Sequence, residues 1–447
     1  MEFVIKISQF LLSLSLLIVL HELGHFIPAK LFKTRVEKFY LFFDVKYSLF
    51  KKKIGETVYG IGWLPLGGYV KISGMIDESM DKEQMAQPPQ PWEFRTKPAW
   101  QRLIIMLGGV TVNFILAYFI YVFLSFAYGD ADVSSESLKD GYWVENQLLL
   151  DLGFQTGDKI LEVNGEKIVN DSEVRKSIIT AEKYTIERNG NKQEIVLPQD
   201  FLGQLSSADR DAGLFKLRIP FVVREVADSS LNKGIDLKPG DQLLSIEGKT
   251  LRYYDEIGRR LSNYKNQTVT ASFLRDSEKI TRELKIDQDG KMGIFPGGTN
   301  GLFSRLGYFE ITTKEYGFFE SFGVGITKFK EQVSSYFDQL GKIFTPSTGA
   351  YKGVGGFKAI FDIFDPVWSW PDFWNLTAFL SIMLGVLNLL PIPALDGGHV
   401  MFLLYEIVSG RKPGDKFMEY AQMVGFFILI ALVLLANGND IYKAIFK

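Results

Sequence analysis

Four long apolar stretches, at residues 1–33, 103–127, 373–400 and 417–437, alternate with polar segments along the chain. Each contains about 18 or more mostly apolar residues, the length that an α-helix needs to cross a hydrocarbon core of about 30 Å. The first stretch lacks the basic residues and the small-residue cleavage site of a secretory signal, so we expect it to be retained. The pattern therefore predicts a multi-pass α-helical membrane protein with four spans and both termini on one side.

Lysine and arginine are concentrated in two polar segments, at residues 34–102 and 401–416. Short loops rich in these residues stay in the cytosol, so the charge pattern places both segments there. Residues 128–372 and the tail at 438–447 then lie on the exported side. A rise of about 1.5 Å per residue puts His21 roughly 27 Å along the first span, near its cytosolic end.

The first cytosolic segment combines β-branched and aromatic residues with several glycines, among them Gly67 and Gly68. This pattern predicts membrane-associated β-hairpins that leave an unpaired strand edge. Such an edge can accept a substrate segment as an additional strand, but a plain surface hairpin would show the same pattern. Both interpretations stay open.

The exported segment contains an internal repeat, because GDKILEVNG at residues 157–165 recurs as GDQLLSIEG at residues 240–248. Each copy consists of a turn, a short apolar strand and a second turn, which predicts two α+β domains at residues 128–214 and 215–298. The order of these elements, with a helix after them, resembles the PDZ domain. That resemblance implies a groove for an extended peptide or a chain terminus, and a spacer or size filter is the alternative. Aromatic, amphipathic residues 299–372 predict helices at the outer membrane interface or beneath this pair.

The composition narrows the functional classes. Hydrophobic residues make up 47% of the chain and the formal net charge is -2, which favours neither nucleic-acid binding nor a polybasic membrane anchor. The absence of cysteine excludes disulfides, thiolate zinc sites and a cysteine nucleophile. Only three histidines are present, and two of them lie in one motif of the first span.

That motif is His21-Glu22-Leu23-Gly24-His25. Residues four apart share one face of a helix, so the two histidines can bind one zinc ion while Glu22 reaches a water molecule on that ion. An unpaired ionisable group inside a membrane costs roughly 2.5 to 3.5 kcal/mol, and a metal ion is the natural compensating partner. The motif therefore predicts a zinc hydrolase, although cobalt or iron would also suit two histidines and a carboxylate.

The third apolar stretch ends in NLLPIPALDGGH at residues 388–399. Its two prolines must interrupt the helix, and the freed backbone groups require packing against protein or a wet cavity. Asp396 follows this break at the depth of the two histidines and is the predicted third zinc ligand. His399 is the alternative, but three histidine ligands would leave the carboxylate of Asp396 unexplained. A metzincin-type third histidine is excluded, because Leu31 occupies that position.

The second apolar stretch brings a small residue close to a buried amide. Gly109 and Asn113 are four residues apart, so a surface for close helix contact lies one turn from the amide. Asn113 either hydrogen-bonds a neighbouring helix or steadies the reacting carbonyl or the water on the metal. Both roles stay open.

Taken together, these motifs resemble the site-2 protease family, and within it the bacterial regulator-of-sigma-E branch with tandem PDZ domains. The resemblance rests on HELGH in the first span and on Asn-x-x-Pro-x-Pro-x-Leu-Asp-Gly in a later one. Around the second span it rests on Phe94, Lys97, Trp100, Arg102, Gly109 and Asn113. This chain has Gly109-Val110 where relatives commonly have Gly-Pro, and we expect that difference to change local helix shape rather than chemistry.

The resemblance implies an intramembrane zinc metalloprotease of the bacterial inner membrane. His21, His25 and Asp396 would bind one zinc ion, and Glu22 would act as the general base. The substrates would be single-span membrane proteins, such as anti-sigma factors or remnant signal peptides. The residues expected to contact substrate are Asn113, Asn388, Pro391, Gly67 and Gly68.

Two other classes are alternatives. A membrane protease of the prenyl-protein type also carries HELGH on a membrane helix, but its third ligand is a glutamate and it lacks PDZ domains. Asp396 in its Leu-Asp-Gly setting therefore argues against that class. A noncatalytic PDZ scaffold would bind partners without hydrolysis and would not require Glu22.

Overall fold

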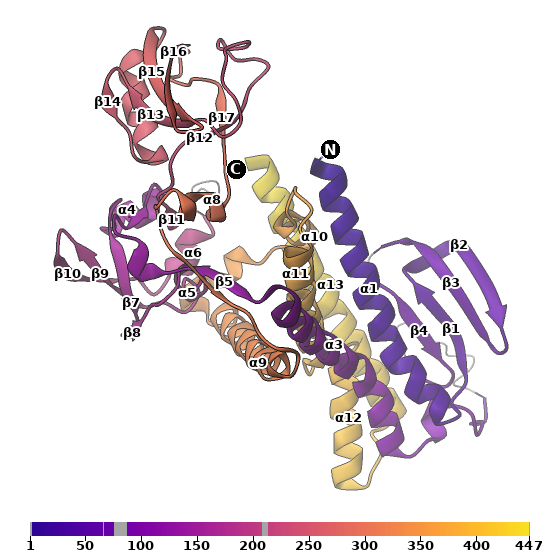
Figure 1. Cartoon of the computed structure of the whole chain (residues 1–447). Helices are drawn as coiled ribbons and strands as arrows, with labels where there is room; N and C mark the ends of the chain where they lie inside the picture. The colour runs from indigo at the N-terminus through magenta and orange to yellow at the C-terminus, as the bar shows by residue number, and fades with distance from the viewer. Residues whose placement is uncertain (1, 66, 76–86, 208–212, 447) are drawn as a thin grey trace. The chain divides into compact units, whose positions relative to one another are not determined.

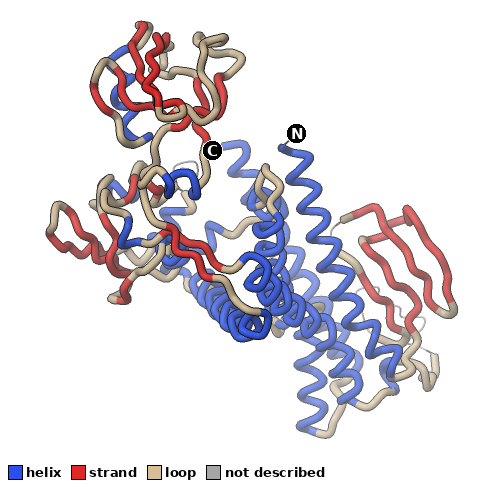
Figure 2. Tube along the Cα trace, viewed as in Figure 1, coloured by secondary structure: helices blue, strands red, loops and turns tan. Residues whose placement is uncertain are grey.

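The computed structural model describes residues 2–65, 67–75, 87–207 and 213–446. Contacts divide the chain into two compact units. The first unit consists of Met1–Gly129, Glu315–Leu340 and Val354–Lys447, and the second of Asp130–Lys314 and Gly341–Gly353. Long helices dominate the first unit, whereas most strands belong to the second (Figure 2).

Among the described residues, four helices of the first unit are long and apolar enough to span a membrane, which confirms the four predicted spans. They are α1 (Glu2–Leu31), α3 (Ala99–Tyr128), α11 (Trp370–Leu389) and α13 (Asp415–Phe446). Both α1 and α11 pack against α3. Figure 1 shows the N- and C-termini at the same end of this group of helices, as an even number of spans requires.

An additional helix, α12 (Asp396–Ser409), follows the break after α11. The sequence predicts a span up to residue 400 and a loop at residues 401–416, whereas the structure ends α11 at Leu389 and extends α12 to Ser409. The cytosolic position of residues 401–416 stays a prediction. α11 ends at Leu389, because the two prolines that follow cannot continue it. No proline interrupts α12, which continues until Gly410, where the φ angle of 66° ends the helix.

The segment between α1 and α3 forms one four-stranded sheet in place of separate hairpins. Its strands are β1 (Val36–Leu41), β2 (Phe43–Ile54), β3 (Thr57–Leu64) and β4 (Tyr69–Ile72), in the order β2-β3-β1-β4. β2 and β3 form an antiparallel hairpin, but β1 lies parallel to β3 and antiparallel to β4. Among the described strands, β4 is therefore an edge strand.

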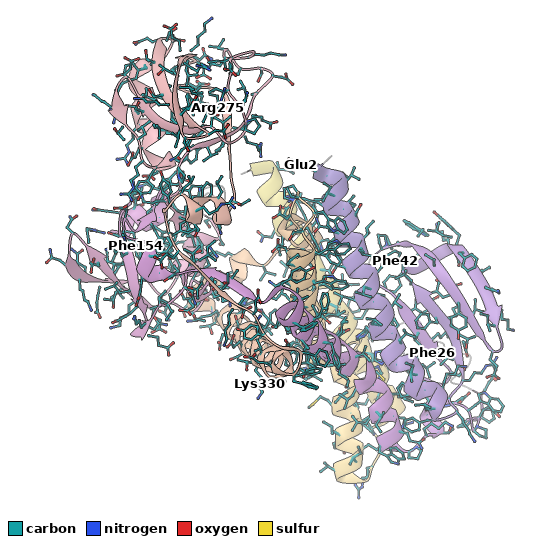
Figure 3. The ribbon with its side chains drawn as sticks, viewed as in Figure 1. Glu2, Phe26, Phe42, Phe154, Arg275 and Lys330 are labelled. Atoms are coloured by element: carbon teal, nitrogen blue, oxygen red, sulfur yellow. The ribbon has the colours of Figure 1, made fainter. Side chains whose placement is uncertain are left out.

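Aromatic side chains attach this sheet to α1. Phe26 of α1, labelled in Figure 3, contacts the rings of Phe39 and Tyr59 at centroid distances of 5.5 and 6.0 Å. Gly68, just before β4, also packs closely on α1, since a Cβ atom there would lie 2.5 Å from Ile18 Cγ2. The edge strand thus lies beside the helix that carries the HELGH motif.

The second unit contains two modules built on the repeated motif. The main sheet of the first module has the order β10-β9-β7-β8, with strands β7 (Lys159–Val163), β8 (Glu166–Lys167), β9 (Lys183–Arg188) and β10 (Asn191–Val196). Its helices are α4 (Gln147–Asp151), α5 (Asp171–Ser177) and α6 (Phe201–Leu205), and β6 (Tyr142–Trp143) pairs with β11 (Lys216–Leu217). The second module contains β12 (Val222–Val226), β13 (Gln242–Ile246), β14 (Lys249–Thr250), α7 (Ile257–Leu261), β15 (Thr268–Arg275), β16 (Glu278–Lys285) and β17 (Ile294–Gly297).

The two copies of the motif form the same local structure. Each copy places its apolar strand, β7 or β13, before a tight turn of two residues with positive φ. In the first copy these residues are Asn164 and Gly165, and in the second they are Glu247 and Gly248. The apolar strand and the turn agree with the sequence pattern, and the turn leads directly into a short antiparallel partner strand that the pattern did not predict.

The aspartate of each motif copy is buried and binds an arginine from the neighbouring strand. Asp158 pairs with Arg188, and Asp241 pairs with Arg275, each with a nitrogen to oxygen distance of 2.7 Å. Figure 3 labels Arg275 in the second module. The repeated aspartate therefore stabilises each module internally.

Residues that follow the second module return to the first. β18 (Ile311–Lys314) pairs with β5 (Asp130–Val133). Phe303 in α8 (Asn300–Arg305) joins the core of the first module, which also contains Phe154, labelled in Figure 3. The segment expected at the membrane interface thus begins within the second unit.

The amphipathic helix α9 (Phe318–Ile343) packs its apolar side chains against other helices. Phe329, Val333 and Tyr336 contact a cluster formed by α3 and α11, and Lys328 donates a hydrogen bond of 2.9 Å to Ser125 Oγ of α3. Helices therefore cover part of the apolar face of α9, whereas Phe319 and Phe337 are exposed. Its expected position at the membrane interface stays a prediction. A short helix, α10 (Phe357–Ile363), follows and contacts α1.

Candidate metal centre

The two histidines of the HELGH motif lie one turn apart on α1, and each is 7% exposed. Their Nε2 atoms are 3.3 Å apart. Oδ2 of Asp396, the first residue of α12, lies 3.4 Å from His21 Nε2 and 3.3 Å from His25 Nε2. The three predicted ligands therefore present one donor atom each at the corners of a nearly equilateral triangle.

This triangle has the size that a zinc ion requires. Ligand atoms at about 2.0 to 2.1 Å from tetrahedral zinc lie about 3.3 to 3.4 Å from one another. Oδ2 of Asp396 is buried and accepts no hydrogen bond from the described residues, so a cation is the partner that its burial calls for. Two imidazoles and one carboxylate are also a donor set of catalytic zinc sites, which keep a fourth position open for water. The residues present fit zinc.

His399, the alternative third ligand, is directed toward a different helix. Its Nε2 atom lies 2.9 Å from Nε2 of Gln422 on α13. The structure thus groups Asp396 rather than His399 with the two histidines of α1.

Packing against the first turns of α3 holds the helix that carries Asp396. Val400 and Leu403 of α12 are buried in one cluster with Ile105 of α3. Arg102 of α3 donates a hydrogen bond to the carboxylate of Glu406, and both side chains are largely buried. α12 therefore has both apolar and ionic contacts that fix its position relative to α3.

Three glycines allow α1 and α3 to approach at backbone distance. A Cβ atom on Gly24 would lie 2.3 Å from the carbonyl oxygen of Gly108, and one on Gly109 would lie 2.4 Å from His25 Nε2. The sequence analysis identified Gly109 as a surface for close helix contact. It missed the pairing of Gly108 with Gly24, although that glycine lies inside the HELGH motif itself.

Groups on α3 and α11 contact the two imidazole rings. His25 Nδ1 lies 2.8 Å from the carbonyl oxygen of Ile105. The amide of Asn113, which is fully buried, lies 3.1 Å from His21 Nδ1, whereas the amide of Asn388 lies 3.3 Å from His21 Nε2. Sequence reasoning missed the contact of Ile105, because a backbone carbonyl leaves no signature in the residue types.

Glu22, the candidate general base, faces the edge strand β4. The backbone of Val70 in β4 lies near its carboxylate, and a Cβ atom on Gly68 would lie 3.5 Å from Glu22 Cγ. Gly67 has a φ of 154° and packs against a ring of the sheet. Pro391 is exposed in the interrupted segment between α11 and α12. The structure thus brings Gly68 close to Glu22, with Gly67 beside it in the chain.

Comparison with known proteins agrees with this geometry. The model of Peptidase family M50 matches residues 9–432. A protein of Borreliella burgdorferi that is named as a zinc metalloprotease is 30% identical, over 96% of this chain and 96% of its own length. A similarly named protein of Campylobacter jejuni is 27% identical, over 97% of this chain and 92% of its own length. The regulator of sigma E protease of Haemophilus influenzae is 25% identical, over 99% of this chain and 100% of its own length. With a match that covers nearly the whole chain and a ligand triangle of the size of zinc, the chain belongs to peptidase family M50, the site-2 protease family of zinc metalloproteases.

Proposed function

We propose that this chain cleaves the membrane-spanning segments of single-span membrane proteins. The observation that carries the proposal is the position of the ligand triangle. His21 and His25 belong to a helix that is long and apolar enough to span a membrane, and Asp396 meets them there. A peptide bond must therefore enter this group of helices to be hydrolysed.

The chemistry follows from the residues around the triangle. Zinc bound by His21, His25 and Asp396 would polarise the scissile carbonyl and lower the pKa of a water molecule toward about 7. Glu22 lies on the same helical turn as His21, and its carboxylate accepts the proton that the attacking water loses. The same carboxyl group then donates this proton to the leaving amine as the C–N bond breaks.

The edge of β4 supports a route for the substrate. A helical segment satisfies its own backbone hydrogen bonds, so its peptide bonds are inaccessible until the helix unwinds. β4 lies beside Glu22 and offers backbone groups to an extended segment, and Gly68 lets this strand pack closely on α1. Asn388 and Pro391, at the end of α11 and in the interrupted segment after it, supply further contacts. We propose that the unwound substrate pairs with β4.

The charge pattern supports one orientation in the membrane. Lysines and arginines at residues 34–102 and 401–416 favour a cytosolic position for the four-stranded sheet and α12. The two modules of the second unit then lie outside the bacterial cytoplasmic membrane. Their order of elements resembles PDZ domains, which supports binding of extended peptides or chain termini and exclusion of intact ectodomains. Since one relative is named a regulator of sigma E protease, anti-sigma factors are the first substrate class to test, and remnant signal peptides the second.

The test compares the wild-type chain with Glu22→Gln in detergent or in membranes. Both proteins receive a tagged single-span substrate that lacks its ectodomain, and zinc content is measured beside cleavage. Loss of cleavage with zinc retained supports the proposal, because the amide of glutamine cannot accept the proton. Cleavage by Glu22→Gln at the wild-type rate would refute the mechanism. Zinc in both proteins without cleavage of any substrate would favour a noncatalytic scaffold.

A further inference from the structure

One face of α3 contacts both histidines of the metal centre. Ile105, Gly109 and Asn113 are spaced four residues apart and therefore share this face. The carbonyl oxygen of Ile105 lies 2.8 Å from His25 Nδ1, and the Asn113 amide lies 3.1 Å from His21 Nδ1. Gly109, between them, leaves room for both rings. Nδ1 of each histidine thus lies against a polar group of α3, and Nε2 of each lies near Asp396.

Metal binding through Nε2 fixes where the imidazole proton lies. A neutral imidazole carries one N–H, so a ring whose Nε2 lone pair binds a metal carries its proton on Nδ1 and needs an acceptor there. For His25 the acceptor is the carbonyl oxygen of Ile105. For His21 it must be the oxygen of the Asn113 amide, because the amide nitrogen has no lone pair to offer.

The amide of Asn113 can adopt this orientation where it is buried. With its nitrogen toward His21, the amide leaves its oxygen buried and without a hydrogen-bond partner among the described residues. The two ends of a carboxamide have the same shape, so a half-turn of the group exchanges them without other movement. That half-turn pairs the oxygen with the Nδ1–H of His21 and puts the amide nitrogen where the oxygen was. The tautomer of His21 therefore selects the orientation.

We infer that Asn113 is a positioning residue that acts through His21. Its amide oxygen accepts the Nδ1 proton and so keeps the Nε2 lone pair directed at the metal. Asn388 has a different role, because its amide lies 3.3 Å from His21 Nε2, on the side where metal and substrate meet. The two asparagines that contact the His21 ring therefore have separate roles. Asn113 supports metal affinity, and Asn388 supports the reaction.

The inference rests on the proposed zinc site, but its tests measure metal affinity and a ring proton rather than cleavage. The first test is competition with a zinc chelator, using the full-length chain in detergent. Asn113→Leu keeps the side-chain volume and removes the acceptor, so zinc binding should weaken about 10- to 100-fold. Asn113→Asp keeps an acceptor and should bind zinc within about threefold of wild type, since carboxylates support histidine ligands in the same way.

Asn388→Leu is the matched control, because it removes the other amide that contacts His21. It should retain wild-type zinc affinity and lose cleavage of the tagged single-span substrate. Wild-type affinity in Asn113→Leu would overturn the inference. An equal loss of affinity in Asn113→Leu and Asn113→Asp would overturn it as well, since a required amide N–H donor would then explain both results.

The second test needs no variant of Asn113. The chain has only three histidines, so isotope-labelled histidine gives nitrogen NMR signals from three rings, and His399→Gln identifies one of them. In the zinc-loaded chain, His21 should carry a hydrogen-bonded proton on Nδ1 and none on Nε2. A proton on Nε2, or an Nδ1 proton that exchanges as freely as one exposed to water, would refute the role of Asn113. A chain that cleaves nothing but shows this proton would contradict the proposed protease and leave the inference intact.

Discussion

Replacing Gly109 by alanine should disturb the packing of α3 against the two histidines without weakening the α3 helix itself. Alanine is favoured over glycine in a helix interior by about 1 kcal/mol, so α3 itself should form at least as readily. The added Cβ atom, however, would lie 2.4 Å from His25 Nε2 and 2.6 Å from His21 Cε1. Ordinary van der Waals contact begins at 3.4 Å. The substitution therefore acts on the two zinc ligands rather than on the helix.

The size of the effect follows from these distances. The rings must retreat by about 1 Å, whereas metal–ligand distances tolerate only about 0.2 Å. α1 cannot move away as a whole without losing its contact at Gly108, where the backbone of Gly24 already packs. Disturbing groups behind a metal ligand costs about 10- to 100-fold in metal affinity. Displacement of both ligands should therefore cost at least about 100-fold.

The assay measures zinc content and cleavage in Gly109→Ala, with Gly323→Ala as the matched control. Gly323 also lies within a helix, α9, but a Cβ atom there would meet nothing within 4 Å. We expect Gly323→Ala to behave like wild type in both measurements and Gly109→Ala to lose zinc and cleavage together. Wild-type zinc content in Gly109→Ala would show that α1 and α3 separate more easily than this packing implies, and the reasoning would fail.

Three further predictions concern the metal, the edge strand and the second module. Removal of zinc by a chelator should abolish cleavage, and zinc but not magnesium should restore it; cleavage that survives complete metal removal would contradict the site. Gly68→Ala should reduce cleavage of a helical substrate at least about 10-fold with zinc content unchanged. The reason is that the new Cβ atom would lie 2.5 Å from Ile18 Cγ2 and move β4 away from α1. Unchanged cleavage would argue against pairing of the substrate with β4. Burial raises the pKa of Asp241, but hydrogen bonds from Arg275 outweigh it and hold the pKa below the usual carboxyl value. This stabilisation is complete above about pH 4 and is lost as the pH falls through the lowered pKa. Thermal unfolding of the full chain should therefore show Asp241→Asn destabilised at pH 7 and less so near pH 3; equal midpoints at pH 7 would refute the importance of this pair.

The parts of the metal centre that sequence could predict are those encoded locally. His21 and His25 are one helical turn apart, so any helix brings them together. Asp396 is far away in sequence, but the prolines before it place a helix break, and the depth of that break in the third span matches the depth of the histidines. Composition helped as well, since a chain with three histidines has few candidate ligands.

Other parts depend on tertiary contacts that residue types do not encode. The carbonyl of Ile105 and the contact between Gly24 and Gly108 both involve backbone atoms. The sequence does not reveal where α12 begins. Its apolar residues after Asp396 have the same composition as the end of a membrane span. In the same way, β1 pairs parallel to β3, a topology that a pattern of hairpins cannot reveal.

The aspartate that recurs in both copies of the motif has a structural role that the sequence does not reveal. The motif predicts a turn at Asp158 and at Asp241, and each aspartate does follow a turn. Their carboxylates are buried, however, and bind arginines that lie two strands later in the chain order of each module. The arginines differ in local context, so only the folded sheets show why the aspartate recurs.

The contact between Gly24 and Gly108 affects how α1 and α3 respond to a change in membrane thickness. Two backbones meet there with no side chain between them, so no change of rotamer can alter the spacing of α1 and α3. A membrane that becomes thinner or thicker makes helices tilt, and we expect this pair to tilt together. We therefore expect His21 and His25 to keep their position against α3 when the lipid composition changes, and the surfaces that face lipid to adapt instead.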